Sequence, residues 1–409
     1  MTTPIFMNVN TSAPTPKVVM SYGMGEDSTA ILLRWLEDPT SRDFDLTDLA
    51  VVTAMTGDEW ESTRTVVEAH ILPRMAAAGV RFIQAARSRR HVTKAGDGVV
   101  VLSDSRAPTR LHLEGDYTLW REMAEAGTIP QSGGARTCSV HSKGDVLDPI
   151  IAKITRGHSY RHVLGFEAGE LRRAAKDETY NTASRTGEYP LIEWEWYRDD
   201  AIDYTRSIIG TSPGRSACFY CPFSLGNKAS RAHMLTRYAA EPAIAARTLL
   251  MEHLALALNP AQGLIGGKRL IDLIRTEAMT GVLDAWEDLL GSQRHAIYEV
   301  RRIISARGGD PDVAGNVQRS LRLRCTGTRE MLQDVLDRLA ADGAAKGVTA
   351  AITGDDGIMR LYQHQRAATF PTIERFFVVA PALAPTKERA GFDERWAAFV
   401  NDTGPAAAA

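Results

Sequence analysis

A glycine-containing turn near the amino terminus carries the residue types that hold phosphate. The segment 21–28 follows a short apolar stretch, 17–20, and precedes a helical pattern at 29–36. Glycines let the backbone approach a ligand closely, and the N–H groups at a helix start supply donors in a favourable dipole. Asp27 and Ser28 stand at that start, where they can cap the helix or contact a phosphate or its metal. The spacing predicts a phosphate-binding loop, with a plain capped turn as the alternative.

A second polar turn, Thr56-Gly57-Asp58-Glu59, follows the apolar stretch 49–55. Carboxylates at the end of a buried strand can position Mg²⁺ or a ribose. A solvated acidic turn is the alternative for this segment.

Three of the four cysteines lie between 138 and 221, and two of these three, Cys218 and Cys221, form a Cys-x-x-Cys; the third is Cys138. The cysteines are too few and too unevenly spread for a secreted disulfide scaffold. In an intracellular chain such a pair indicates metal or redox chemistry. Cys325 stands apart on a predicted strand, where we expect it to be a core residue.

The elements that must position these residues alternate between strands and helices. Apolar stretches predict strands at 17–20, 49–55 and 80–85, and amphipathic patterns predict helices at 29–36 and 63–78. This alternation predicts an α/β fold, a doubly wound, mainly parallel sheet with a ligand at the carboxyl edge of its strands. The expected divisions of the chain are a flexible lead-in at 1–16, an α/β domain with the phosphate loop and the cysteine site at 17–228, a helical region at 229–307, and a small α+β unit at 308–405 that begins in a linker at 307–312.

The composition excludes several classes of protein. The 409 residues are too many for one compact core, so two domains are expected. Lys+Arg 48 against Asp+Glu 50 gives a net charge of −2, so a nucleic-acid substrate would need a local basic groove. The patch Arg87–His91 is one candidate, and a solvated cationic loop is its alternative. The chain shows neither a signal-peptide pattern nor a membrane-spanning apolar run, and we expect a soluble cytoplasmic protein.

The motifs resemble, in their order along the chain, those of a known superfamily. SYGMGEDSTAILL at 21–33 resembles the PP-loop of the ATP pyrophosphatase (adenine-nucleotide alpha-hydrolase-like) superfamily, and TGDEWEST at 56–63 resembles the second element of its phosphoadenosine-phosphosulfate reductase-like branch. One departure stands in the loop, because the family's leading serine aligns with Gly23 and Ser21 lies upstream of it. The later segments that resemble elements of that branch are Arg136-Thr137-Cys138 with Lys143, Gly165 with Glu170-x-x-Arg173, and Tyr189-Pro190-Leu191 with the Cys-Phe-Tyr-Cys-Pro-Phe of 218–223.

The resemblance implies a PP-loop (HUP-like) domain that binds ATP with Mg²⁺ and adenylates an oxygen-bearing substrate. Sulfur from an unidentified donor would then displace AMP, and the acceptor would be a nucleobase, a nucleic acid or a small metabolite. The residues that the resemblance assigns to catalysis are Asp27, Lys143, Glu170 and Arg173. Those that it assigns to the nucleotide and its metal are Ser21, Gly23, Gly25, Asp27, Ser28, Thr56, Gly57, Asp58 and Glu59.

The resemblance also places Cys138 beside Cys218 and Cys221, and four uses of this trio stay open. Three cysteines can hold a [4Fe–4S] cluster that keeps one iron open, as in thiolating relatives. With His141 they can form a closed Cys3His zinc site. They can act as a redox dithiol that exchanges with substrate sulfur, or they can be inert buried thiols.

Two other functions are alternatives to sulfur transfer. A true phosphoadenosine-phosphosulfate or adenylyl-sulfate reductase needs a nucleophilic cysteine near the carboxyl terminus, and none follows Cys325. A non-catalytic nucleotide- and zinc-binding protein, regulatory or defence-associated, would accord with the altered loop.

Overall fold

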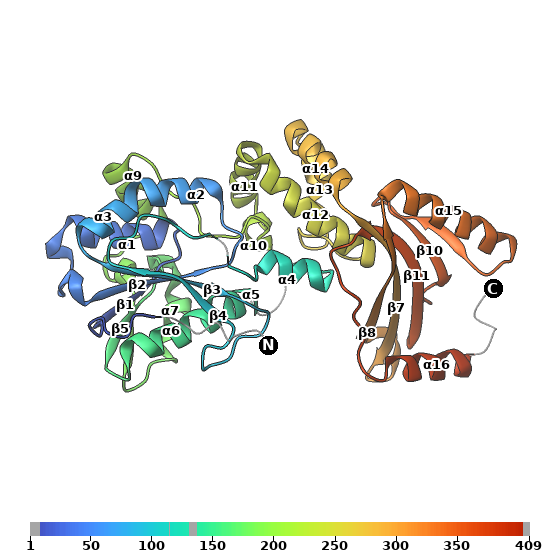
Figure 1. Cartoon of the computed structure of the whole chain (residues 1–409), viewed down its shortest axis with the longest axis horizontal. Coiled ribbons are helices and arrows are strands. Elements are labelled where there is room, and N and C mark those ends of the chain that lie inside the picture. Colours follow the sequence, from blue (N-terminus) through green and yellow to red (C-terminus); the bar gives the residue numbers. More distant parts are fainter. Residues whose placement is uncertain (1–8, 114, 131–136, 404–409) are drawn as a thin grey trace. The chain divides into compact units, whose positions relative to one another are not determined.

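The chain forms two compact units, each with its own sheet (Figure 1). Unit 1 comprises Met1–Glu122 and Gly134–Cys221, and unit 2 comprises Met123–Gly133 and Pro222–Ala409. The chain therefore passes from one unit to the other three times. The residues that the computed structural model describes are 9–113, 115–130 and 137–403.

Unit 1 is built on a six-stranded sheet in the order β4-β3-β2-β1-β5-β6. Every neighbouring pair is parallel except β3 and β4, which run antiparallel at one edge. The order reverses between β1 and β5, and such a point leaves a crevice beyond the carboxyl ends of the strands. The predicted α/β class with a mainly parallel sheet is confirmed. The strands are β1 (Val18–Ser21), β2 (Leu49–Met55), β3 (Arg81–Arg87), β4 (Val99–Ser105), β5 (Tyr160–Val163) and β6 (Arg185–Glu188).

Helices cover both faces of this sheet because alternate residues of its central strand are apolar on both sides. Val18 and Met20 pack with Ile31 of α1, whereas Val19 packs with Ile150 of α6 on the other face. Figure 1 shows α1, α2 and α3 above the sheet and α6 below it. The helices are α1 (Glu26–Glu37), α2 (Glu61–Val66), which continues through a π-helical turn (Val67–Ile71) into α3 (Leu72–Ala77), α4 (Leu119–Ala126), α5 (Thr137–Ser139), α6 (Asp145–Thr155), α7 (Leu171–Glu178), α8 (Pro190–Glu193) and α9 (Arg198–Ile209).

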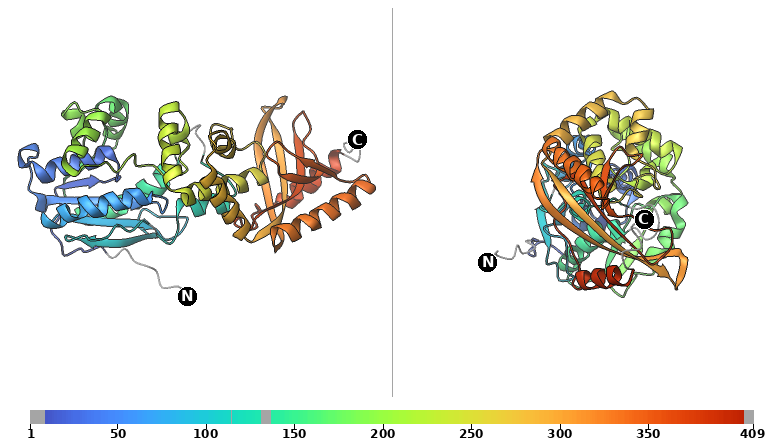
Figure 2. Two further views of the ribbon diagram at one scale, coloured as in Figure 1. Left: turned by 90° about the horizontal axis from the view of Figure 1, so that it is seen from above. Right: turned by 90° about the vertical axis from the view of Figure 1, so that its right-hand side faces the viewer.

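Unit 2 contains a five-stranded antiparallel sheet in the order β8-β7-β11-β10-β9, with helices on both faces (Figure 2). Ile297 of β7 packs with Leu336 of α15 on one face. Arg302 of the same strand donates a hydrogen bond to the carbonyl of Leu258, the last residue of α12. The strands are β7 (His295–Arg307), β8 (Asp310–Gly327), β9 (Ala350–Thr353), β10 (Met359–His364) and β11 (Thr372–Pro381). The helices are α10 (Pro222–Leu225), α11 (Lys228–Ala240), α12 (Pro242–Leu258), α13 (Leu270–Thr276), α14 (Thr280–Ser292), α15 (Arg329–Ala345) and α16 (Phe392–Thr403).

The expectation of helix up to residue 307 and of a linker at 307–312 is wrong. The last helix before the sheet ends at Ser292, and 295–307 form β7, where β-branched and aromatic residues recur. Gly308 and Gly309 have φ of 63° and 85°, and both lie in the tight turn that joins β7 to β8. A two-residue turn of this kind requires left-handed backbone, which glycine adopts without a steric cost.

The amino-terminal segment is less free than the predicted flexible lead-in at 1–16. Val9 is buried in the core beneath the sheet. The N–H of Asn10 donates to the carboxylate of Asp104 at 2.8 Å, and the guanidinium of Arg81 donates to the Asn10 carbonyl. The described part of this segment, from residue 9 onward, is therefore attached to the sheet through β3 and β4.

Candidate functional site

The loop between β1 and α1 lies at the carboxyl edge of the sheet, next to the point where the strand order reverses. Its backbone carries unused donors. In the part of the chain that the structure describes, the N–H groups of Gly23, Met24, Gly25, Asp27 and Ser28 have no hydrogen-bond acceptor. Unpaired donors at the start of a helix are the groups with which a backbone binds an anion.

A strap of backbone that begins at Pro213 and ends at Ala217 crosses this edge of the sheet. The hydroxyl of Thr63 in α2 donates to the Pro213 carbonyl at 3.2 Å. The indole N–H of the buried Trp60 donates to the Ala217 carbonyl at 3.1 Å. Both ends of the strap are thus tied to the segment that follows β2.

The middle of the strap lies directly on the loop between β1 and α1. The Gly214 carbonyl accepts the Glu26 N–H at 3.1 Å, so the first donor of α1 is already used. A Cβ added to Gly25 would lie 2.7 Å from the backbone nitrogen of Ser216, and one added to Gly23 would lie 3.1 Å from the Ser216 hydroxyl. The two glycines that the sequence assigns to phosphate binding therefore also make room for the strap.

The hydroxyl of Ser21, which the resemblance assigns to the nucleotide, contacts a histidine. Its Oγ is 2.8 Å from Nε2 of His162 in β5, and Nε of Arg185 in β6 donates to the other ring nitrogen at 3.0 Å. Arg185 in turn forms an ion pair of 2.7 Å with Asp177. Burial of the imidazole, with the charge of Arg185 beside it, lowers the pKa of His162 to about 4.

Two of the four predicted catalytic residues, Asp27 and Glu170, lie near the start of α1, and a third, Arg173, pairs with Glu170. Asp27 forms an ion pair of 3.1 Å with Arg198, the first residue of α9. Burial raises the pKa of Asp27, Arg198 opposes the shift, and the nearby Glu170 adds to it. Glu170 binds Arg173 at 2.6 Å, and the Arg173 guanidinium lies 4.4 Å from the ring centre of Phe166. Arg198 was not predicted, because nothing near it in the sequence marks an ATP motif.

The polar turn after β2 is fixed by its own contacts. Gly57 has φ of 83°, and a Cβ on it would lie 2.3 Å from Cγ2 of Thr118. Asp58 is fully buried, and its Oδ2 accepts the Tyr220 hydroxyl at 2.6 Å and the Trp120 N–H at 2.7 Å. The carboxylate that was predicted to position a metal or a ribose therefore joins β2, α4 and the cysteine segment.

Cys218 lies beside this turn. Its Sγ is 3.6 Å from Oγ1 of Thr56. Burial raises the pKa of the Cys218 thiol well above its usual range, and the negative charges of Glu59 and Asp58 add a smaller increase. The positive charge of Lys143 opposes this shift. The fourth predicted catalytic residue, Lys143, is thus placed near the thiol.

The described residues do not assemble the expected metal site. Among them no group of three His, Cys, Asp or Glu side chains could hold a metal ion. His141, the expected fourth zinc ligand, has its Nδ1 2.8 Å from the carboxylate of Asp145. Cys138 is partly exposed, and Arg136 of the same motif lies outside the described residues. The use of the three cysteines therefore stays a prediction, and we derive no reaction step through a cluster or zinc.

Two further expectations differ from the structure. Cys325, expected in the core, is exposed, because β8 is an edge strand of its sheet. In the basic patch at 87–91, Arg87 is buried and forms an ion pair of 2.6 Å with Glu122. The first arginine of the patch is therefore used within the fold.

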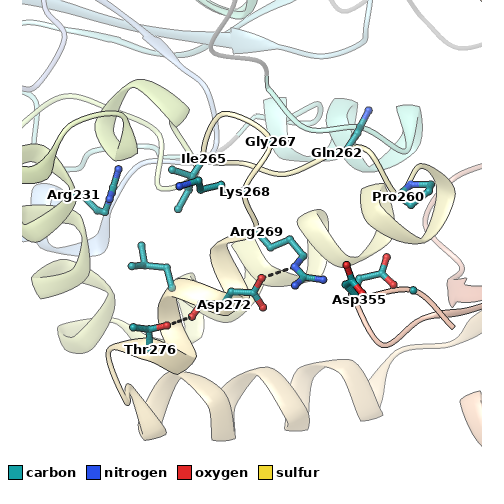
Figure 3. Close-up of a pocket in the computed structure, with 13 residues that line it drawn as sticks. Arg231, Pro260, Gln262, Ile265, Gly267, Lys268, Arg269, Asp272, Thr276 and Asp355 are labelled. Atoms are coloured by element: carbon teal, nitrogen blue, oxygen red, sulfur yellow. Dashed lines mark hydrogen bonds and ion pairs between the residues drawn. The ribbon is translucent and has the colours of Figure 1, made fainter.

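A cavity of about 700 Å³ lies in unit 2, and none of the residues that the sequence singled out lines it. Figure 3 shows Arg231 and Lys268 toward one end of it and Asp355 toward the other. The loop before α13 forms one wall, and Gly266 and Gly267 in that loop have φ of 58° and 89°. This Gly-Gly turn before a helix is the signal by which the cavity could have been found.

A buried carboxylate fixes that wall. Glu252 of α12 is 1% exposed and lies at the start of α13. It takes the place that an anion would occupy at this helix start, so the loop is not a phosphate site. The backbone N–H groups that it accepts are those of Leu264 at 3.0 Å, Leu270 at 2.7 Å and Ile271 at 3.2 Å.

Comparisons with known proteins assign no family. The chain matches no family model, no curated protein and no solved structure. Within the described residues, no helix combines the length and the apolar character needed to cross a membrane.

Proposed function

We propose that unit 1 is a PP-loop (HUP-like) enzyme that uses ATP to adenylate an oxygen-bearing substrate and then exchanges the adenylated oxygen for sulfur. The substrate oxygen attacks the α-phosphorus and pyrophosphate leaves. A sulfur nucleophile then attacks the substrate atom, and AMP leaves with the oxygen. The acceptor is a nucleobase, a nucleic acid or a small metabolite, and the sulfur donor is a separate molecule.

The observation that carries the proposal is the loop between β1 and α1. Five backbone N–H groups from Gly23 to Ser28, which find no acceptor among the described residues, stand at a helix start beside the reversal of strand order. That place in a parallel sheet is where nucleotides bind, and such donors stabilise the charge that develops as pyrophosphate leaves. Each of these residues also falls on the motif that resembles a PP-loop.

The side chains around the loop have distinct parts in this proposal. Asp27 and Ser28 lie at the first turn of α1, next to the phosphates. Arg198 holds Asp27 in place and brings positive charge to the same point. Lys143 and Cys218 lie near each other beside the turn after β2, and in this proposal they handle the sulfur nucleophile. Mg²⁺ would neutralise the triphosphate, and we assign it no protein ligands.

Pyrophosphate release tests the proposal. The anaerobically purified protein should bind ATP and release pyrophosphate, and Asp27→Asn should reduce that release at least tenfold. Asp203→Asn, an exposed site on α9, is the matched control and should leave it unchanged. A wild-type protein that does not bind ATP, or an Asp27→Asn variant as active as wild type, would contradict the assignment.

Metal and sulfide analysis of the same preparation tests what the three cysteines bind. Iron and acid-labile sulfide in the sample would support a cluster at Cys138, Cys218 and Cys221, whereas zinc without iron after anaerobic reconstitution would exclude it. Neither metal, together with reversible oxidation of Cys218 and Cys221, would favour a reductase-type dithiol.

A second candidate function is nucleotide binding without chemistry. It is favoured by one observation, which is that Asp27 already has an ion partner and Gly25 is covered by the strap. ATP binding without pyrophosphate release, over a panel of acceptors and sulfur donors, would support a regulatory or defence-associated protein.

A further inference from the structure

We propose that the strap Pro213–Ala217 is a gate on the nucleotide site, and that the phosphates bind only after it has moved off the start of α1. This inference rests on the proposed function, because it concerns access to the same loop. In the structure described here the gate is closed.

The closed strap and a bound phosphate would compete for the same groups. The Gly214 carbonyl accepts the Glu26 N–H, so the strap places a partial negative charge at the positive end of α1. The backbone of Ser216 lies against Gly25 so closely that even a methyl group would not fit. The strap thus covers the side of Gly25 on which a Cβ would stand, and in our proposal the phosphates reach the loop after this backbone has moved away.

The strap is held in part by hydrogen bonds to its own carbonyls, and these bonds can break without unfolding the domain. Its described attachments to the rest of unit 1 run from Thr63 to the Pro213 carbonyl, from Trp60 to the Ala217 carbonyl and from the Glu26 N–H to Gly214. The side chains in the middle of the strap, Arg215 and Ser216, are exposed. The strap thus makes these attachments through its main-chain carbonyls, and each such hydrogen bond contributes only a modest net free energy.

The closed gate lowers the apparent affinity for nucleotide. When only a fraction of molecules is open, the apparent Kd equals the intrinsic Kd divided by that fraction. A substitution that loosens the strap without touching the loop therefore tightens nucleotide binding. If the strap were instead a wall of the binding site, the same substitution would weaken binding.

Thr63→Val tests the gate, because it removes the hydroxyl that donates to Pro213 and keeps the shape of a buried side chain. Thr65→Val on the same helix is the matched control, since the Thr65 hydroxyl donates to the Glu61 carbonyl within α2 itself. We expect Thr63→Val to bind a non-hydrolysable ATP analogue about fivefold more tightly than wild type, the effect of one lost hydrogen bond. Thr65→Val should bind it as wild type does. Ser216→Gly, which removes the exposed side chain that lies on the loop, should act like Thr63→Val.

Trypsin cleavage after Arg215 supplies a second readout. The analogue should accelerate cleavage of the wild-type protein, and Thr63→Val should be cut faster than Thr65→Val without nucleotide. Protection of Arg215 by the analogue, or unchanged or weaker binding by both Thr63→Val and Ser216→Gly, would overturn the gate alone. Absence of analogue binding in all the proteins would overturn the proposed function and the gate with it.

Discussion

His162 donates a hydrogen bond from Nε2 to the hydroxyl oxygen of Ser21, 2.8 Å away. The direction of this bond follows from the other ring nitrogen, because Nδ1 accepts from the Arg185 guanidinium and so carries no proton. The imidazole therefore has no lone pair to offer Ser21 and cannot act as its base. Ser21 belongs to a chain of structural hydrogen bonds, and its role in nucleotide binding stays a prediction.

His162 should make the stability of unit 1 depend on pH. In the unfolded chain histidine becomes charged below about pH 6.5, whereas in the fold the pKa of His162 is about 4. The unfolded state thus binds more protons between these values, so stability falls as the pH falls, by as much as about 3 kcal/mol. Chemical denaturation from pH 7 to pH 4 measures this slope. His162→Gln, whose amide can donate to Ser21 and accept from Arg185, should flatten it, and an unchanged slope would show that other groups titrate there.

The thiol of Cys218 should respond to the charges around it. Glu59→Gln removes a negative neighbour that raises the pKa of Cys218, so alkylation by iodoacetamide should become faster. Lys143→Met removes the opposing positive charge and should slow it. A change of half a pKa unit alters the thiolate fraction about threefold. Mass spectrometry with the exposed Cys325 as the internal reference gives both rates.

Lys153→Met provides the control for this experiment. Lys153 lies in α6, farther along the chain, and Lys143→Met and Lys153→Met change the net charge equally. Equal slowing of Cys218 alkylation by both variants would mean that Lys143 acts through overall charge and has no local effect on the thiol.

Gly57→Ala should be far more costly than Gly79→Ala. Both glycines have positive φ, 83° and 63°. An alanine in this conformation destabilises the fold by about 1 kcal/mol. A Cβ at Gly79 meets nothing within 4 Å, whereas at Gly57 it meets Thr118 at 2.3 Å. We expect on the order of 2 kcal/mol of further destabilisation at Gly57 from this overlap. Urea denaturation of the two variants measures the difference, and equal losses would mean that Thr118 moves away freely.

Glu252→Ala should destabilise unit 2. The carboxylate accepts three backbone N–H groups, and the loss of these hydrogen bonds should cost roughly 3 kcal/mol. Glu277→Ala, at an exposed position after α13, is the control and should have little effect. Hydrogen exchange at Leu270 should rise in Glu252→Ala only, and an unchanged rate there would show that the carboxylate does not hold this helix start.

The regular part of unit 1 could be predicted because its elements repeat a strong pattern. The predicted strand at 49–55 coincides with β2, since seven consecutive residues are buried between two layers of helices. The helix predicted at 63–78 is present but contains a π-helical turn, since Pro73 has no N–H for the regular ladder. The periodic pattern of apolar residues was therefore enough to predict the order of these strands and helices.

The contacts of the site could not be predicted, because they depend on segments far apart in sequence. A glycine at position 25 suits a phosphate-binding loop, and it also leaves room for the backbone of Ser216. The sequence alone does not show which of these two reasons accounts for the glycine. Asp58 has the type of a metal ligand, but its partner Tyr220 comes from the cysteine segment. The place of Cys325 on a predicted strand suggests a core position, but β8 is an edge strand with a partner on one side only, and Cys325 is exposed.

The chain enters unit 2 early, at Met123–Gly133, and returns to complete unit 1 before the rest of unit 2 is made. The partners of this early segment come much later, since the Ala126 carbonyl accepts from Arg319 and a Cβ on Gly127 would touch Leu258 at 2.4 Å. On the ribosome the segment therefore emerges with nothing to pack against, while the last strands of the first sheet are still to be added. No single cut separates the units, so a fragment that ends at Cys221 would carry an insertion without its partners. Expressing unit 1 alone requires replacing residues 123–133 with a short linker.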